Sequence, residues 1–141
     1  MVETSLSTGR ASIGWVDGPI DTPANPETVS SGALLTFRGV IRPNEDGRHL
    51  AGLQYTHYEP MATQQLQRLA NRATQAHELE YVQIIHSIGF VAAHQASLHI
   101  TIASKHRKAA LLAMNEMLDD LKRDVPIWKT PVFADEPEAT G

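Results

Sequence analysis

The 141-residue sequence contains no cysteine, and this absence alone excludes several kinds of chemistry. The chain forms no disulfide, holds no metal or iron–sulfur cluster through thiolates, and has no cysteine nucleophile. It also lacks any apolar run near the roughly 20 residues that cross a bilayer. No basic patch precedes an apolar stretch at its start, so we expect no secretory signal. These absences favour a cytoplasmic protein that does not enter a membrane.

Positive charge is in short supply, since 12 Lys and Arg stand against 16 Asp and Glu, for a net charge of -4. This balance argues against a general nucleic-acid binder. The cations are nevertheless clustered, because nine of the 12 fall within residues 38–48 and 105–129. A fold that brings these two segments together would create an anion site in an acidic protein.

The length and an ordinary composition, 42% hydrophobic and 20% charged, fit one domain over residues 1–141, with flexible ends at 1–10 and 134–141. Hydrophobic periodicity predicts strands and two main helices along this domain. The predicted elements are an edge strand at 11–16, strands at 33–41, 49–57, 81–87, 96–104 and 127–133, and helices at 61–77 and 107–123. After the edge strand the order is β-β-α-β-β-α-β, which indicates an α+β fold with a mainly antiparallel sheet.

Local signals define some of these elements closely. The turn dipeptide Asp46-Gly47 predicts a hairpin between strands 33–41 and 49–57. The second helix carries an apolar stripe at three- and four-residue spacing, and Pro126 ends it because proline disfavours helical geometry in the residue before it. That stripe consists of Leu111, Met114, Leu118 and Leu121.

Familiar catalytic and cofactor motifs are missing. The seven histidines show no helical i, i+4 pair and no H-E-x-x-H arrangement, so ordinary hydrogen-bonded histidines are a better account than a metal site. There is no G-x-S-x-G nucleophile elbow, no phosphate-binding G-x-x-x-x-G-K-[ST] and no G-x-G-x-x-G. We therefore expect no metal and no resident cofactor.

Two cationic segments remain as candidate sites. Residues 104–108 lie where a strand ends and a helix begins, and His106 and Arg107 would add donors to the positive end of that helix. Lys122 closes the same helix, and Lys129 follows in an apolar, β-like run where partial desolvation would activate it. We expect both lysines to share a pocket with the cations of residues 104–108, the Arg107 cluster. An ordinary solvated surface is the alternative for each single cation.

Several short motifs occur in a fixed order along the chain. Each is weak alone, but the set is specific, and it resembles the large, catalytic subunit of molybdopterin synthase over about residues 11–133. The motifs are Gly32-Ala33-x-x-x-Phe37-x-Gly39-x-x-Arg42, Asp46-Gly47, Leu53-x-Tyr55-x-His57-Tyr58-x-x-Met61, Ile85-His86-x-Ile88-Gly89, Ser104-x-His106-Arg107 and Leu121-Lys122-x-x-x-Pro126-x-Trp128-Lys129.

This resemblance implies an α+β fold with an α/β-hammerhead and a homodimer. Each subunit would bind a small ubiquitin-like sulfur carrier, giving a heterotetramer that contacts neither nucleic acid nor membrane. The carrier's C-terminal Gly-Gly thiocarboxylate would transfer sulfur to cyclic pyranopterin monophosphate and so form the molybdopterin dithiolene. By position, Lys122 and Lys129 match the catalytic lysines. Residues that match the substrate site are Arg42, His106 and Arg107, which would hold the phosphate, with Phe37 and Met114 nearby.

The sequence departs from the family pattern at a few positions. These are Thr56, Ser87, the pair Ala93-His94, and Lys105, together with a short C-terminal tail. A non-catalytic anion-binding or scaffolding homologue of the same fold is the alternative, and an unrelated phosphometabolite-binding protein is a third. With no thiol of its own, a sulfur-transfer enzyme would have to receive the sulfur on a partner.

Overall fold

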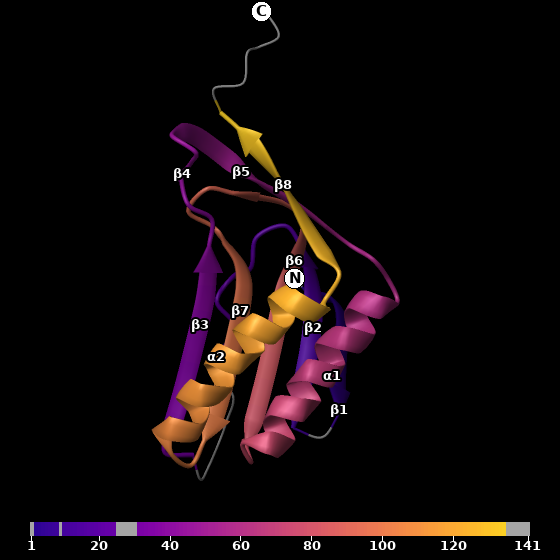
Figure 1. Ribbon diagram of the computed structural model, residues 1–141, viewed down its shortest axis with the longest axis vertical. Coiled ribbons are helices and arrows are strands. Elements are labelled where there is room, and N and C mark those ends of the chain that lie inside the picture. Colours follow the sequence, from indigo (N-terminus) through magenta and orange to yellow (C-terminus); the bar gives the residue numbers. More distant parts are fainter. Residues whose placement is uncertain (1, 9, 25–30, 135–141) are drawn as a thin grey trace, which may run out of the picture.

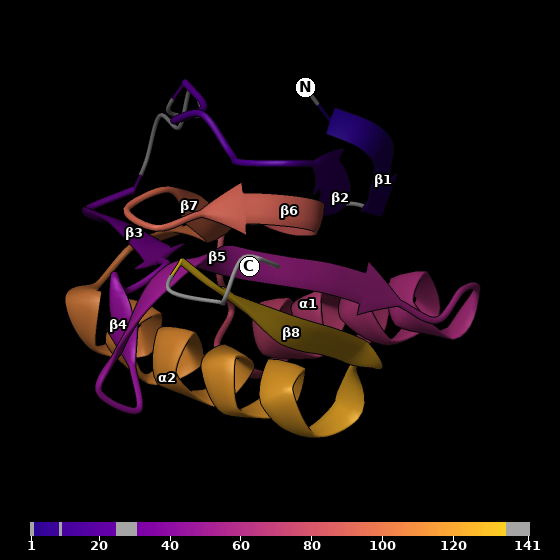
Figure 2. The ribbon, with the colours of Figure 1, turned by 90° about the horizontal axis from the view of Figure 1, so that it is seen from above.

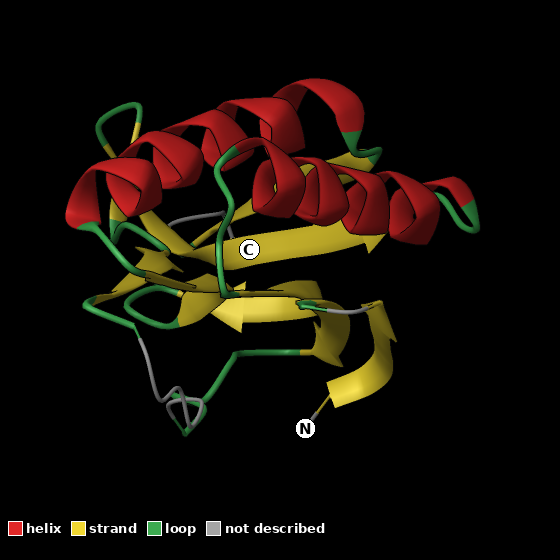
Figure 3. Cartoon of the chain, turned by 90° about the horizontal axis from the view of Figure 1, so that it is seen from below, coloured by secondary structure: helices red, strands yellow, loops and turns green. Residues whose placement is uncertain are grey.

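The computed structural model describes residues 2–8, 10–24 and 31–134. Two helices lie on the same side of one sheet, and Figures 2 and 3 show this layering. The helices are α1 (Met61–Ala76) and α2 (Arg107–Asp124). The strands are β1 (Val2–Thr8), β2 (Ala11–Asp17), β3 (Ala33–Val40), β4 (Asn44–Glu45), β5 (Arg48–His57), β6 (Tyr81–Ala92), β7 (Ala96–Ser104) and β8 (Ile127–Phe133).

The eight strands form one sheet, and β6 is its central strand (Figure 1). Its first half lies between β2 and β7, and its end pairs with β5. Only the β2–β6 pairing is parallel among the recorded pairs; all others are antiparallel. The predicted α+β fold, with a mainly antiparallel sheet and two main helices, is confirmed.

The core lies between the helices and the sheet. Alternation along β7 directs Ile100 and Ile102 to the helices, where they pack with Leu66 of α1 and Met117 of α2. Burying such side chains contributes roughly 1.5–3 kcal/mol each and stabilises this layer. A second, smaller cluster around Leu53 and Val91 joins β5 to the end of β6.

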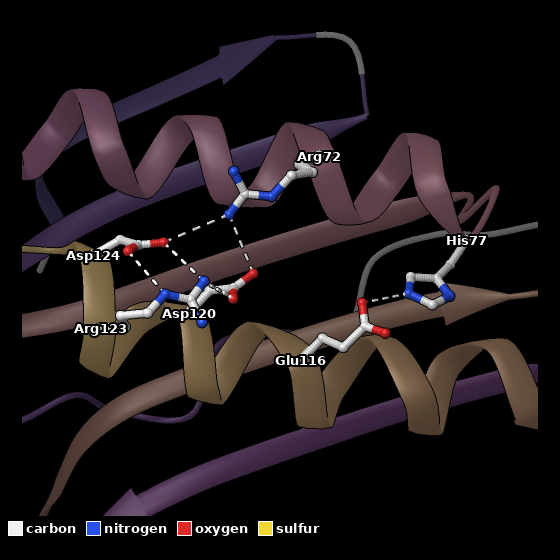
Figure 4. Close-up of polar contacts among 6 residues, drawn as sticks. All are labelled: Arg72, His77, Glu116, Asp120, Arg123 and Asp124. Carbon is white, nitrogen blue, oxygen red and sulfur yellow. Dashed lines mark hydrogen bonds and ion pairs between the residues drawn. The ribbon is translucent and has the colours of Figure 1, made fainter.

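Charged side chains bridge the two helices on their outer surface (Figure 4). Arg72 of α1 lies 3.2 Å from Asp120 and 3.8 Å from Asp124 of α2. His77, at the end of α1, lies 2.8 Å from Glu116. These contacts are exposed or half-exposed, so they orient the helices more than they stabilise them.

The predicted hairpin is wrong, because β3 pairs with β7 and not with β5. The Asp46-Gly47 turn does form, with positive φ at both residues, but it joins β5 to the two-residue β4. The Pro43 carbonyl still accepts from the Leu50 N–H at 2.8 Å, but Pro43 has no backbone N–H to donate in return, so the ladder ends there. A turn dipeptide determines only the residues beside it.

Three further details differ from the predictions. The strand at 11–16 is interior, since β2 has β1 on one side and β6 on the other. The sequence predicts no strand before residue 11, where the structure has β1. Leu111 is 55% exposed, because the face of α2 that meets the core is instead formed by small and flexible residues. Those residues are Ala110, Ala113, Met114, Met117 and Leu121.

The proposed single domain and the flexible ends stay predictions, and residues 1, 9 and 135–141 lie outside the described part of the chain. Within the described residues, neither helix is long and apolar enough to cross a membrane.

Candidate active site

A pocket of about 630 Å³ opens where the C-terminal end of α2 meets β3, β5, β7 and β8. The last turns of α2 supply one wall, because Leu118, Leu121 and Lys122 recur at i, i+3 and i+4 and so lie on one side of the helix. Val125, which caps the helix, also lines the pocket. Leu53 of β5 adds to the apolar lining. The walls therefore favour a ligand with a substantial apolar or ring-shaped part.

Three cations stand at this pocket: Arg42, Lys122 and Lys129. Arg42 follows β3, Lys122 lies in the last turn of α2, and Lys129 lies on β8. All three are exposed, and no ion pair is recorded for any of them within the described residues. Three unpaired cations around an apolar hollow suit an anionic ligand. The partial desolvation expected for Lys129 is not found, because its side chain is exposed in this chain.

An uncharged polar group lies deeper in the same pocket. The hydroxyl groups of Tyr55 and Ser97 are 3.0 Å apart, and the ring of His86 meets the Tyr55 ring edge-on with centroids 5.2 Å apart. All three residues line the pocket and are at most 9% exposed. His86 Nδ1 donates to the carbonyl of Ser87 at 2.8 Å.

Burial determines the protonation of this deeper group. It lowers the pKa of His86 to about 4, an effect that nearby His57 adds to and the hydrogen bond to Ser87 opposes. Burial likewise raises the pKa of the Tyr55 hydroxyl, against the lowering effect of its hydrogen bond to Ser97. At neutral pH both side chains are therefore uncharged, so the pocket has a neutral floor. Its rim is net cationic, because Arg42, Lys122 and Lys129 outnumber the one acidic lining residue, Glu45.

The structure brings together four of the residues that the sequence singles out: Phe37, Arg42, Lys122 and Lys129 all line this pocket. They come from β3 and the residues just after it, from α2 and from β8, and the β5–β8 pairing sets Lys129 in place. The predicted convergence of the two lysines is met in the structure.

The other three predicted residues lie elsewhere. His106 and Arg107 are exposed at the start of α2, and Met114 is buried in the core between the helices and the sheet. At a rise of about 1.5 Å per residue, Arg107 lies roughly 20 Å along the helix from Lys122. The expectation that the Arg107 cluster shares the lysine pocket is therefore wrong within one chain.

Sequence reasoning assigned no role to Tyr55, Ser97 or His86. A usable signal was present, because Tyr55 lies two residues from Leu53 and so faces the same side of β5. Its proximity to Lys129 and Ser97 depends on pairings that the sequence did not predict. Within residues 2–8, 10–24 and 31–134, no three His, Asp or Glu side chains come close enough to share a metal ion.

Comparison with known proteins shows the family to which this architecture belongs. The family model described as MoaE protein matches residues 17–124. The chain belongs to the MoaE family. The molybdopterin synthase catalytic subunit of Oryza sativa subsp. indica is 35% identical over 107 residues, which are 76% of this chain and 55% of that protein. This chain thus spans little more than half the length of that curated relative.

Solved structures of MoaE-like proteins share the fold. Molybdopterin synthase from Staphylococcus aureus superposes with a TM-score of 0.75 at 28% identity, over 86% of this chain and 90% of that one. A complex of subunits 1 and 2 of molybdopterin-converting factor from Helicobacter pylori 26695 gives a TM-score of 0.68 at 24% identity, over 88% of this chain and 90% of that chain. At 24% identity this second likeness concerns the fold alone.

Proposed function

We propose that this chain is the catalytic subunit of a molybdopterin synthase. It transfers sulfur from a thiocarboxylated carrier protein to cyclic pyranopterin monophosphate and so forms the molybdopterin dithiolene. The observation that carries this proposal is the convergence of Arg42, Lys122 and Lys129 on one apolar-walled pocket. Family membership adds support, since a relative with 35% identity bears this name.

The charges of the two reactants suit such a pocket. A cyclic phosphate and a thiocarboxylate are both anions, and Arg and Lys donate charge-assisted hydrogen bonds to such groups. Attack by sulfur places negative charge on an oxygen, which a fixed ammonium group stabilises. We assign Lys122 and Lys129 to the carrier terminus and the developing charge, and Arg42 to the phosphate.

The partner in this proposal is a small ubiquitin-like carrier whose C-terminal Gly-Gly reaches the pocket. The chain would also form a homodimer, and with two carriers a heterotetramer in the cytoplasm. His106 and Arg107 lie too far from Lys122 along α2 to reach the pocket of their own chain. In this proposal they bind anionic substrate only across the dimer, in the pocket of the second copy.

The departures from the family pattern leave the pocket intact. Thr56, Ser87, His94 and Lys105 are all absent from the pocket lining. Ser87 is fully buried, and its hydroxyl donates to the carbonyl of Gly18 at 2.6 Å, so its role is in packing. This favours an active enzyme over the alternative of a non-catalytic anion-binding homologue.

The direct test mixes the purified chain with a thiocarboxylated carrier and cyclic pyranopterin monophosphate, and measures dithiolene formation. The same carrier ending in an ordinary carboxylate is the matched control, since it binds alike but holds no sulfur. We expect product only with the thiocarboxylate. A folded chain that binds the carrier and yields no product would refute the enzyme and favour the non-catalytic homologue.

A further inference from the structure

The pocket has two polar zones at different depths. Arg42, Lys122 and Lys129 are exposed at its rim, whereas Tyr55 is 9% exposed and His86 and Ser97 are each 5% exposed. A ligand that fills the pocket therefore meets these three cations and the single carboxylate of Glu45 toward solvent, and only neutral groups at the floor. This gradient distinguishes one end of the ligand from the other.

The floor offers both donors and acceptors to a ligand. Tyr55 and Ser97 share one hydrogen bond, in which either hydroxyl donates, so one O–H proton of the pair has no acceptor recorded among the described residues. Because Nδ1 of His86 donates to the Ser87 carbonyl, Nε2 of the neutral ring carries a lone pair and accepts. A ligand carbonyl would accept that remaining proton while the hydrogen bond between the two hydroxyls stays in place.

The floor also excludes an anion. A phosphate placed there would leave water for apolar walls and neutral hydroxyls, while the cations that stabilise it stand at the rim. An uncharged planar ring with amide-like N–H and C=O groups matches both the walls and the floor. Such a ring with a phosphate attached fits in only one direction.

We propose that Tyr55, Ser97 and His86 form the subsite for the uncharged ring of the substrate, so that the pterin enters ring first and its phosphate stays at the cationic rim. This assignment rests on the function proposed above. Within it, Tyr55 and Nε2 of His86 are the binding groups of the floor, and Ser97 positions the Tyr55 hydroxyl.

Binding measurements with two probes test this orientation. Isothermal titration calorimetry would use cyclic pyranopterin monophosphate, which has ring and phosphate, and 6-hydroxymethylpterin, which has the ring alone. We expect Tyr55→Phe to weaken both by about 10-fold, because one hydrogen bond to the ring is lost. Arg42→Ala should weaken only the phosphate-bearing probe, because Arg42 is the residue assigned to the phosphate. Tyr58→Phe is the matched control, since Tyr58 is 58% exposed and absent from the pocket lining, and it should change neither affinity.

The outcomes separate this inference from the function itself. If the unmodified chain binds neither probe, the proposed substrate is wrong. If it binds them and Tyr55→Phe changes neither affinity, or Arg42→Ala weakens the ring-only probe as much as the phosphate-bearing one, the ring-first orientation is refuted while the function stands. Ser97→Ala, a smaller change at the same hydrogen bond, should weaken both probes in the same sense and covers the case in which Tyr55→Phe fails to fold.

Discussion

Tyr55 and Lys129 are direct cross-strand partners on the antiparallel strands β5 and β8. Side chains at such positions have Cβ atoms roughly 4.5–5.5 Å apart and share one face of the sheet. Both line the pocket, so a neutral phenol deep in the site lies next to an exposed ammonium group at its rim. The pairing thus places the proposed ring-binding residue beside the lysine proposed to stabilise the developing charge.

Lys129→Ala should lower sulfur transfer by about 100- to 1,000-fold, the usual effect of removing one group that stabilises a developing oxyanion. The assay is dithiolene formation with saturating thiocarboxylated carrier. Arg68→Ala is the control, because Arg68 is an exposed cation on α1, outside the pocket lining. Equal losses for the two variants would contradict a specific role for Lys129.

Stability should fall on mild acidification because of His86. Its folded-state pKa of about 4 lies below the ordinary 6.5, so between these values the unfolded chain binds a proton that the folded chain does not. The contribution of His86 to the free energy of unfolding therefore decreases by about 3 kcal/mol as pH falls from 6.5 to 4, and it is constant outside this window. Urea unfolding at pH 7 and pH 5 should show roughly 2 kcal/mol of this loss.

His86→Leu isolates the contribution of that one side chain. The variant should lose less stability between pH 7 and pH 5 than the unmodified chain does. Some pH dependence should remain, because burial and the neighbouring Arg38 also lower the pKa of His99. Identical slopes for the two proteins would show that His86 protonates as readily in the folded state as in the unfolded one.

Thr63→Val should destabilise the fold through Trp15. The indole Nε1 donates to Thr63 Oγ1 at 3.0 Å, and the Trp15 side chain is buried. Valine has the same shape without the hydroxyl, so a buried donor loses its acceptor at a cost of about 1–3 kcal/mol. Thr36→Val on the exposed side of β3 is the comparison and should stay within about 0.5 kcal/mol. Denaturant midpoints that shift equally would argue against this hydrogen bond.

Gly52→Ala should lower the melting temperature. Gly52 lies in β5 between β6 and β8, and a Cβ there would stand 2.3 Å from the Val91 carbonyl oxygen and 2.6 Å from the Phe90 ring. Relieving this overlap forces backbone apart, at about 1–3 kcal/mol. Thr56→Ala on the same strand is exposed and should have little effect. A Gly52→Ala protein as stable as the control would mean that the strands separate at no cost.

Local patterns in the sequence predict the helices well, and the pairing of strands poorly. Helix 61–77 is visible because residues three and four apart meet within one segment. The pairing of β3 with β7 is not visible in the sequence, because it joins segments separated by three strands and a helix. No local signal chooses between β5 and β7 as the partner of β3.

The same distinction explains the site. Lys122 and Lys129 could be paired from sequence, since a proline turn alone separates the end of a helix from the next strand. Arg107 could not be placed correctly by charge alone, because a rigid helix keeps its two ends apart. Tyr55 and Ser97 meet only after β5, β6 and β7 have assembled.

The position of β8 in the chain has a kinetic consequence. Its partner β5 is made before α1, β6, β7 and α2, so β5 must wait with one side unpaired until Ile127–Phe133 arrives. Closing so long a loop is entropically slow, and docking of β8 should be a late event in folding. A nascent chain would then carry most of its core before the pocket is complete.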